Sequence, residues 1–542
     1  MFRKFGSGSV LLVCLLATGS CSSSRHVETS PPFDILLVGG TVYTGEDTAP
    51  VREDVGILDG RIVALGDLHG REARLRRDVH GLAVAPGFMD IHSHAVREAL
   101  NDGVFRWPDA ENLIRQGVTT VIGGPDGYSP LPITDTFEYL EHHPVAVNYG
   151  TFVGHSSIRA AVMGNEDRPA TAAELDAMAG LVNQAMRSGA FGLSSGLIYP
   201  PGRFAGTDEV VRLASVAGEY GGIYISHMRD EGLNVLKSVE ETIHIGEAGR
   251  LPTQITHHKI VSASLWGAST QTLAMVDAAR ARGVDVSIDV YPYTASASDL
   301  TILFPGWSLD GGPRALLRRL HDVETRASLK AAVIRNLKED RGGNDPANVA
   351  IASCPFGSEL NGKNLSEILR QQGRPITFEQ AAELLLELVE RGSCQGIYHA
   401  ISSQDIENII RHPVTMIASD GGVEGPSERM PHPRNYGTFA RLLGLYVREM
   451  KVLPLQTAIH KITQMPAERI GLTDRGRLAP GVVADIVVFD PDQIVDRATF
   501  DNPHQYAAGV DHVFVGGVAV LLDGAMTGAR PGTILRSSDY RR

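Results

Sequence analysis

The chain has 542 residues, of which 43% are hydrophobic and 21% are charged. These proportions are those of an ordinary globular protein, and the length allows two or three domains or one barrel with additions. The formal net charge is -13, from 50 basic and 63 acidic residues. Because binding to nucleic acid needs clustered Lys and Arg side chains that neutralise phosphates, we expect no nucleic-acid partner.

The first 21 residues have the order of an export signal. Arg3 and Lys4 precede the apolar residues 10–16, and small residues then lead to Cys21. An apolar stretch of this length is too short for a transmembrane helix and is typical of a cleavable signal. Residues 17–21, Ala-Thr-Gly-Ser-Cys, resemble a bacterial lipobox, although Thr18 stands where Leu is usual.

We therefore predict a lipoprotein-type signal peptide over residues 1–21 and an exported protein of the bacterial cell envelope, periplasmic or cell-surface. A lipid on Cys21 would be its sole contact with the membrane. An ordinary cleavable signal with an incidental cysteine is the alternative. Cys354 and Cys394 remain in the mature chain, and export permits a disulfide between them, although sequence does not show whether they are close.

The two ends of the mature chain share a β-rich character. Residues 35–38 and 55–65 near the start, and 484–489 and 513–520 near the end, are short β-type runs. Asp59-Gly60 between two apolar runs predicts a tight hairpin. We expect one small β-sandwich built from both chain ends, with its first part at residues 34–86 and its second part at residues 474–535.

The central part of the chain alternates between strand and helix patterns. A helix over residues 171–188 starts with a capping box of Thr171 and Glu174 and repeats apolar side chains on one face. Eight apolar runs are typical of strands: 87–91, 118–122, 145–153, 190–193, 222–225, 252–255, 284–290 and 414–417.

Eight parallel strands with intervening helices predict an α/β fold, a (β/α)₈ TIM-type barrel over residues 87–473, in preference to a doubly wound sheet. Residues 298–412 are too many for one crossover and predict an insertion late in the barrel.

Polar side chains follow several of these strands. His92 and His94 lie one residue apart directly after a strand, so both point to the same side. His227, His257 and Asp420 each end or follow another strand. Each alone could be structural, but the carboxyl ends of barrel strands meet on one face, where the active sites of this fold lie. Together they predict a metal site.

Seven ordered motifs resemble those of the D-aminoacylase (N-acyl-D-amino-acid deacylase) family of the amidohydrolase superfamily. They are residues 86–94 (PGFMDIHSH), 192–200 (GLSSGLIYP), 226–229 (SHMR), 256–259 (THHK), 291–296 (YPYTAS), 418–421 (ASDG) and 432–437 (HPRNYG). The resemblance spans nearly the whole mature chain. It implies the barrel with its small β-sandwich, and hydrolysis of the linear amide bond of a small N-acyl-D-amino acid. It also implies a tightly bound divalent ion, expected to be Zn²⁺, and leaves room for a second, weaker ion.

The resemblance assigns the metal ligands to His92, His94, Asp126, His227 and His257, and the proton-transferring role to Asp420. Asp126 stands where the family commonly has a Cys. A carboxylate is an acceptable zinc ligand, but it is harder than a thiolate and suits several divalent ions. The alternative is that Asp126 only organises a Pro-Asp-Gly turn.

The carboxylate of an N-acyl amino acid needs cationic and hydroxyl donors. Lys259, Tyr199 and Ser296 match family positions for this role, and Tyr291 aligns less securely. Arg434 is a candidate for bidentate binding, with a loop-organising salt bridge as the alternative.

Substrate preference has one further signal. Residues 260–279 and 283–313 contain no Arg or Lys, and the second stretch holds four apolar side chains, Leu300, Ile302, Leu303 and Phe304. We expect these four to line a pocket for neutral, hydrophobic D-residues.

Three other functions stay open at this point. A cyclic-amide hydrolase, similar to hydantoinases or dihydroorotases, commonly carries a carboxylated Lys at the end of the fourth strand, and residues 189–195 contain no Lys. A dipeptide hydrolase would use the same metal site. A non-catalytic binding lipoprotein on the same scaffold would not need Asp420. The sequence leaves the oligomeric state open.

Overall fold

The computed structural model describes residues 32–96 and 103–540. The predicted signal peptide and Cys21 lie outside this range. Within it, none of the helices has the length and apolarity needed to cross a membrane.

The centre of the molecule is a closed ring of parallel strands. Its members are β6 (Phe88–Asp90), β7 (Val118–Gly123), β8 (Asn148–Thr151) with its continuation β9 (Val153–Gly154), β10 (Gly192–Gly196), β11 (Ile223–His227), β12 (Thr253–Ile255), β13 (Val286–Val290) and β17 (Thr415–Ile417). They form two parallel sheets, β6-β7-β8 and β17-β13-β12-β11-β10-β9. The sheets meet on one side at β8 and β9, which only Phe152 separates.

The other seam closes at the site residues themselves. The backbone N–H of Asp420 donates to the carbonyl of His92, and that of His94 donates to the carbonyl of Gly421. A parallel bridge joins Ser93 to Gly421. The barrel and its eight predicted strands are thus confirmed.

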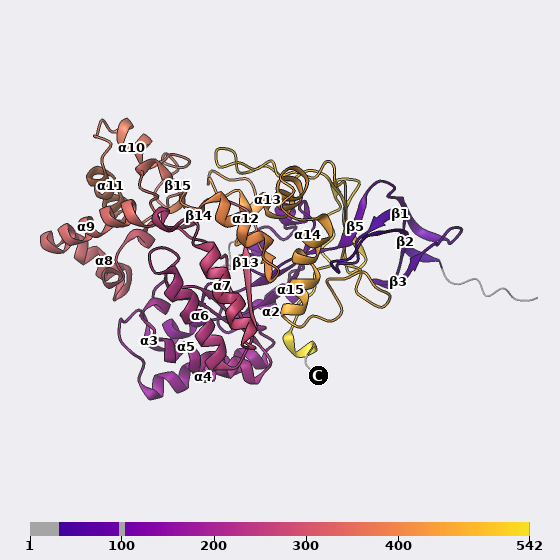
Figure 1. Cartoon of the computed structure of the whole chain (residues 1–542), viewed down its shortest axis with the longest axis horizontal. Helices are drawn as coiled ribbons and strands as arrows, with labels where there is room; N and C mark the ends of the chain where they lie inside the picture. Colours follow the sequence, from indigo (N-terminus) through magenta and orange to yellow (C-terminus); the bar gives the residue numbers. More distant parts are fainter. Residues whose placement is uncertain (1–31, 97–102, 541–542) are drawn as a thin grey trace, which may run out of the picture.

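Helices cover the outside of the barrel (Figure 1). They include α2 (Ile133–His142), α3 (His155–Met163), α4 (Ala172–Arg187), α5 (Thr207–Glu219), α6 (Val235–Gly249), α7 (Ser269–Ala281), α12 (Ser403–Arg411), α13 (Arg434–Arg441), α14 (Leu455–Ile462) and α15 (Gln464–Arg469). The predicted capping box is present at the start of α4, where Thr171 and Glu174 cap each other. The face of α4 that packs inward buries Met178, Val182 and Met186.

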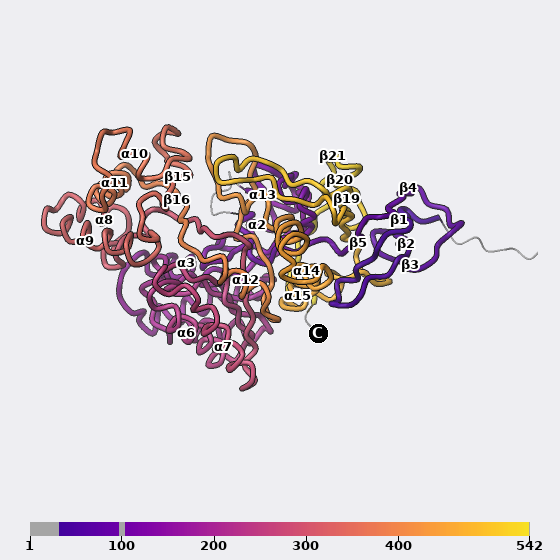
Figure 2. Tube along the Cα trace, turned by 45° about the horizontal axis from the view of Figure 1, so that its top comes forward, coloured from indigo at the N-terminus to yellow at the C-terminus, as the bar shows by residue number. Residues whose placement is uncertain are grey.

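Both chain ends contribute to a nine-stranded sheet beside the barrel. The first end supplies β1 (Phe33–Val42), β2 (Val51–Leu58), β3 (Arg61–Gly66), β4 (Ala73–Asp78) and β5 (Ala83–Pro86); the second supplies β18 (Ile486–Phe489), β19 (Val510–Val515), β20 (Val518–Leu522) and β21 (Ala525–Met526). Antiparallel pairing of β18 with β5 joins the two halves, and Figure 2 shows β19–β21 in the same part of the molecule as β5, from which β18 separates them in the sheet. Asp59 and Gly60, both with positive φ, form the predicted hairpin turn between β2 and β3.

A separate subdomain, named here the insertion subdomain, extends from the barrel opposite the nine-stranded sheet (Figure 1). Its elements are β14 (Ser296–Asp299), α8 (Gly312–His321), α9 (Val323–Glu339), β15 (Val349–Ser353), α10 (Leu365–Gln371), α11 (Phe378–Glu390) and β16 (Gln395–Tyr398). Helix α12 follows, but it packs on α7 and β17 of the barrel.

The insertion subdomain has its own apolar core, and this core corrects one prediction. Leu300, Leu303 and Phe304 are at most 1% exposed and belong to it, with Ile302 packed against it. These four side chains therefore hold the subdomain together instead of forming a substrate pocket.

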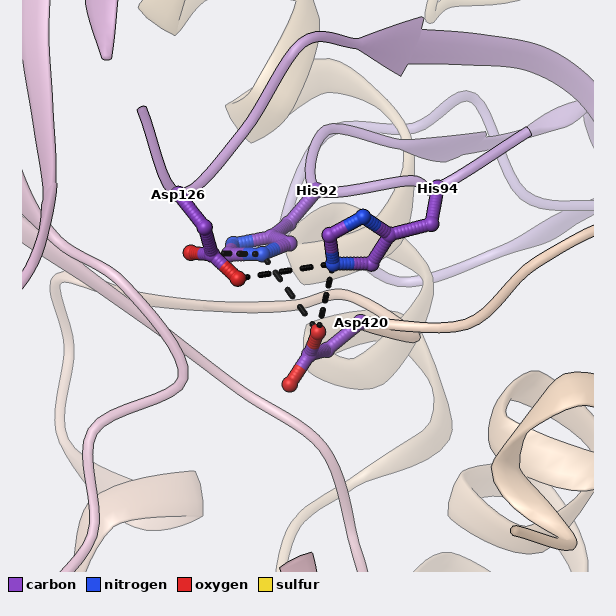
Figure 3. A group of neighbouring side chains, drawn as sticks. All are labelled: His92, His94, Asp126 and Asp420. Carbon is purple, nitrogen blue, oxygen red and sulfur yellow. Dashed lines mark hydrogen bonds and ion pairs between the residues drawn. The ribbon is translucent and has the colours of Figure 1, made fainter. Parts of the chain in front are cut away.

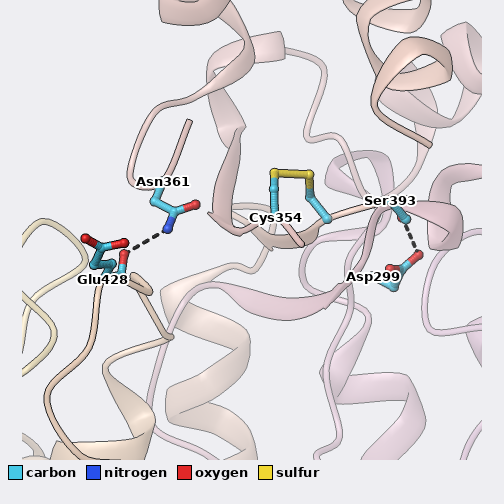
Figure 4. Close-up of a disulfide and its surroundings, with 6 residues drawn as sticks. Asp299, Cys354, Asn361, Ser393 and Glu428 are labelled. Carbon is cyan, nitrogen blue, oxygen red and sulfur yellow. Dashed lines mark hydrogen bonds between the residues drawn. A yellow bond between two sulfur atoms is a disulfide. The ribbon is translucent and has the colours of Figure 1, made fainter. Parts of the chain in front are cut away.

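A disulfide between Cys354 and Cys394 closes one edge of the insertion subdomain (Figure 4). It links the residue after β15 to the residue before β16, across a sequence separation of 40. Beside it, the Ser393 hydroxyl donates to Asp299 at 2.9 Å, so the start of β16 is also tied to the end of β14.

Candidate metal centre

The polar residues predicted to converge at the carboxyl ends of the strands do so. Asp126, His257 and Asp420 have positive φ angles of 56°, 35° and 49°. Residues other than glycine rarely adopt this left-handed conformation, and it persists only where the surrounding structure imposes it. All three side chains belong to the clusters described next, so the strained turns place them there.

The first cluster comprises His92, His94, Asp126 and Asp420 (Figure 3). His92 Nε2 and His94 Nε2 each lie 3.4 Å from a different oxygen of Asp126. On the other side, Asp420 Oδ1 is 3.1 Å from His94 Nε2 and 3.6 Å from His92 Nε2. The four candidate ligand atoms lie within 4.8 Å of one another.

The second cluster comprises Asp126, His227 and His257. Asp126 Oδ1 lies 3.3 Å from His257 Nε2 and 3.8 Å from His227 Nδ1. Asp126 belongs to both clusters, so its carboxylate faces four imidazoles. The backbone of Asp126 does turn, as the alternative interpretation required, but the side chain points into the cluster.

These residues fit a divalent metal ion. Among the described residues, four atoms that face the clusters are buried without a hydrogen-bond partner: Nε2 of His92, Nδ1 of His227, Nε2 of His257 and Oδ1 of Asp126. Buried polar atoms are nearly always paired, so a group of unpaired ones needs an explanation. Imidazole nitrogen and carboxylate oxygen are the ligand types that zinc and similar divalent ions accept.

The charges of the two carboxylates depend on their neighbours. Burial would raise the pKa of Asp126, but His92 and His257 hold it well below its usual value. Burial would also raise the pKa of Asp420, yet Arg434 and the imidazoles lower it, with Arg434 Nη1 only 2.8 Å from Asp420 Oδ2. Both carboxylates are therefore ionised at neutral pH.

Of the five predicted substrate-binding residues, Lys259 and Tyr199 contact the second cluster directly, and Arg434 contacts Asp420 of the first. Lys259 Nζ donates to the His257 carbonyl at 2.9 Å, and Ser296 is 3% exposed. The ring of Tyr199 packs edge-on against His227, with centroids 4.7 Å apart. The Tyr291 ring has two cations close to it, with Lys259 Nζ 5.5 Å and Arg434 Cζ 4.7 Å from its centroid.

Two of these side chains keep unused hydrogen-bonding atoms. Within the described part of the chain, the buried Tyr291 hydroxyl and Arg434 Nε have no hydrogen-bond partner. Arg434 also forms an ion pair with Asp420 through Nη1. A salt bridge, the alternative role given above, therefore occupies Nη1 and leaves Nε available.

Sequence reasoning missed three buried residues of this region. Glu231 contacts His227 and His257, Arg341 pairs with Glu231, and Asp289 Oδ1 lies 3.6 Å from His92 Nδ1. Glu231 comes two residues after the SHMR motif and could have been included with it. Arg341 lies in the insertion subdomain, and no motif marks it.

Comparison with known proteins agrees with this arrangement. The amidohydrolase family model matches residues 77–521. D-aminoacylase from Alcaligenes xylosoxydans xylosoxydans is 37% identical over 529 residues, which cover 93% of this chain and 98% of the relative. N-acyl-D-glutamate deacylase from the same organism is 36% identical over 527 residues, with coverage of 93% and 96%.

A solved structure also matches over nearly the whole chain. The crystal structure of N-acyl-D-glutamate deacylase from Bordetella bronchiseptica, complexed with zinc and a phosphonate inhibitor, aligns with a TM-score of 0.79 at 32% identity. The alignment covers 93% of this chain and all of that chain. With the barrel, the ligand clusters and these near full-length matches, the chain belongs to the amidohydrolase family and, within it, to the group of the D-aminoacylases.

Proposed function

We propose that this protein hydrolyses N-acyl-D-amino acids to a free D-amino acid and a carboxylate, with zinc as its metal. The single observation that carries the proposal is the position of Asp420. Its carboxylate is 3.1 Å from His94 in a cluster of candidate metal ligands and 2.8 Å from Arg434 on the substrate side. A purely binding protein has no need of an ionised carboxylate between these two groups.

His227, His257 and Asp126 would hold the tight ion, and His92 and His94 a second, weaker one. A divalent ion bound there lowers the pKa of a water molecule and polarises the amide carbonyl. The zinc in the Bordetella relative supports the choice of metal. Oxygen from Asp126 in place of sulfur makes harder divalent ions acceptable as well.

Asp420 acts as the base and then as the acid. Its ion pair with Arg434, at 2.8 Å, favours the ionised carboxylate, which is the form that accepts a proton from the attacking water. It returns that proton to the amide nitrogen, which leaves only when protonated. Arg434 stays beside Asp420 throughout and keeps the carboxylate oriented.

Lys259, Arg434 and the Tyr291 hydroxyl bind the carboxylate of the amino acid. The unused N–H of Arg434 and the unused hydroxyl of Tyr291 are buried donors, and donors to a carboxylate make short, strong hydrogen bonds. Tyr199 and Ser296 line the same side. This set favours a linear N-acyl amino acid over a hydantoin, whose ring carries no free carboxylate.

We also propose that the protein is exported and attached to the envelope through lipid on Cys21. The order of residues 1–21 supports export. The disulfide between Cys354 and Cys394 agrees with it, because disulfides persist mainly outside the reducing cytosol.

The test uses protein that begins after Cys21, loaded with zinc and assayed on matched N-acetyl-D- and N-acetyl-L-amino acids, a hydantoin and a dipeptide. We expect turnover of the D-substrates with little or none of the others. A preference for the hydantoin, the dipeptide or the L-substrates would show that the protein catalyses a different reaction from the proposed one. Absence of turnover on all of them, with zinc bound, would favour the binding-protein alternative.

A further inference from the structure

Glu231 is a fully buried carboxylate with four charged or ionisable partners. It lies four residues after His227 and is 0% exposed. Its Oε1 accepts a hydrogen bond from Lys259 Nζ at 2.6 Å, and its Oε2 accepts one from Arg341 Nη2 at 3.0 Å. A buried charge is tolerated only when it is paired in this way, so Glu231 is held firmly in one place.

The same carboxylate faces the two imidazoles of the second cluster. Glu231 Oε1 lies 3.1 Å from His257 Nδ1, and Oε2 lies 3.4 Å from His227 Nε2. The opposite nitrogen of each ring faces Asp126, at 3.3 Å for His257 Nε2 and 3.8 Å for His227 Nδ1. Each ring therefore lies between Asp126 and Glu231.

This placement determines which ring nitrogen is available to a metal. A nitrogen that binds a metal needs a free lone pair, so in a neutral imidazole the other nitrogen carries the proton. A carboxylate facing that protonated nitrogen fixes both the tautomer and the orientation of the ring. Glu231 thus favours a free lone pair at Nε2 of His257 and at Nδ1 of His227, the two atoms that face Asp126.

Lys259 also acts on the tautomer of His257. Lys259 Nζ lies 2.8 Å from His257 Nδ1, and an ammonium can only donate. By itself it would favour the tautomer of His257 whose proton is on Nε2, which could not bind a metal there. Glu231 Oε1 accepts from the same ammonium at 2.6 Å and also lies 3.1 Å from His257 Nδ1, so it supplies the acceptor that a proton on Nδ1 requires.

Arg341 connects this carboxylate to the insertion subdomain. It follows α9 and is only 3% exposed. Besides its hydrogen bond to Glu231, its Nη1 donates to Ser296 Oγ at 3.3 Å. Two residues earlier, the carbonyl of Glu339 accepts from Ser262 of the barrel at 2.6 Å, which docks the end of α9 beside the metal centre.

We propose that Glu231 is the positioning residue of both candidate zinc-binding imidazoles, and that Arg341 makes the insertion subdomain a part of the metal site. The inference rests on the proposed function only in requiring a bound metal. The competing explanation is that Lys259, Glu231 and Arg341 merely dock the subdomain. In that case their replacement lowers stability without changing how the metal is held.

The experiment measures zinc binding and needs no substrate. Glu231→Gln keeps the shape of the side chain and removes its charge, whereas Glu231→Asp keeps the charge. The zinc dissociation constant is measured by competition with a chelator, and ligand geometry by the visible spectrum of the Co²⁺-substituted protein. We expect Glu231→Gln to weaken zinc binding by about 10- to 100-fold and to change the cobalt spectrum, and Glu231→Asp to recover part of both.

Glu209→Gln is the matched control. Glu209 is also buried and ion-paired, since it contacts His155 at 2.9 Å and Arg159 at 2.5 Å, but it belongs to neither ligand cluster. We expect it to leave zinc affinity and the cobalt spectrum unchanged. For the insertion subdomain, Arg341→Met should weaken zinc binding, while Arg326→Met, which removes an ion pair with Glu383 inside that subdomain, should not.

Wild-type zinc affinity and cobalt spectrum in folded Glu231→Gln would overturn the proposal, and so would an equal loss in Glu209→Gln. Wild-type zinc affinity in Arg341→Met would show that the insertion subdomain does not contribute to metal binding. If Glu231→Gln does not fold, the comparison of Arg341→Met with Arg341→Lys, which keeps a cation, decides the question. Because no substrate is used, a failure of the proposed reaction leaves these results valid.

Discussion

Arg434 Nη1 lies 2.8 Å from Asp420 Oδ2, and this ion pair fixes both the charge and the direction of the proposed base. One oxygen of Asp420 is turned toward Arg434, and the other lies 3.1 Å from His94 Nε2. The carboxylate therefore lies between the candidate metal ligands and the side chains proposed to hold the substrate.

Asp420→Asn tests that position directly. The amide has nearly the same shape but cannot accept the proton, so we expect kcat to fall by about 10²- to 10⁴-fold, with the fold and the zinc held by His227 and His257 retained. Steady-state kinetics and metal analysis of the purified variant measure both. Turnover like that of the wild type would show that another group moves the proton.

Substitutions of Asp126 distinguish its two candidate roles, as a metal ligand and as a residue that only forms a turn. If Asp126 binds the metal, Asp126→Cys should keep a metal site and increase the preference for zinc over harder ions, because thiolate is the softer ligand. Asp126→Ala should lose metal on dialysis against a weak chelator. Unchanged metal content in Asp126→Ala would return Asp126 to a role in its turn alone.

The strand ends could be predicted because each ligand lies at the end of a strand or within four residues of it, as His227 lies at the end of β11. Arg341 and its pairing with Glu231 could not be predicted, because the pair depends on how the insertion subdomain docks, across a sequence separation of 110 residues. Leu300 and Phe304 were placed wrongly for a related reason. An apolar run has the same pattern whether it lines a pocket or packs in a second core.

The ion pairs of Glu209 predict a dependence of stability on pH. Burial would raise the pKa of Glu209, but His155 and Arg159 outweigh it, so the pKa is lower than in the unfolded chain. Its stabilising effect is therefore complete above the unfolded pKa of about 4.3 and is lost as the pH falls through the folded pKa.

We accordingly expect Glu209→Gln to lower the free energy of unfolding by about 1–3 kcal/mol at pH 7, and the difference from wild type to shrink below about pH 4. Urea denaturation of both proteins between pH 3 and 7 measures it. A difference that stays constant over this range would show that the charge of Glu209 is not what stabilises the fold.

Cys21→Ser tests the lipid anchor. Acyl chains on a lipoprotein cysteine supply membrane affinity through their buried methylene groups, and no helix of the described residues could replace them by spanning the membrane. We expect the full-length variant to move from the membrane fraction to the soluble fraction after export, with its activity unchanged. Continued membrane association of Cys21→Ser would contradict the lipoprotein prediction.

The last prediction concerns the side chain of the substrate. The apolar run that suggested a preference for neutral residues lies in the core of the insertion subdomain, and the two relatives of nearly equal identity are a D-aminoacylase and an N-acyl-D-glutamate deacylase. The charges nevertheless favour neutral substrates. Lys259 and Arg341 share Glu231, and Arg434 is paired with Asp420.

Because Lys259 and Arg434 are proposed to bind the first substrate carboxylate, a second one would have to compete with it for them, take Arg341 from Glu231, or remain buried without a partner, and each is costly. We therefore expect kcat/KM to be higher for N-acetyl-D-leucine than for N-acetyl-D-glutamate by at least about tenfold, the equivalent of 1.4 kcal/mol. Both substrates should be compared at one ionic strength, because salt screens the charged one selectively. A higher kcat/KM for the glutamate substrate would show that one of these cations leaves its partner to bind the second carboxylate.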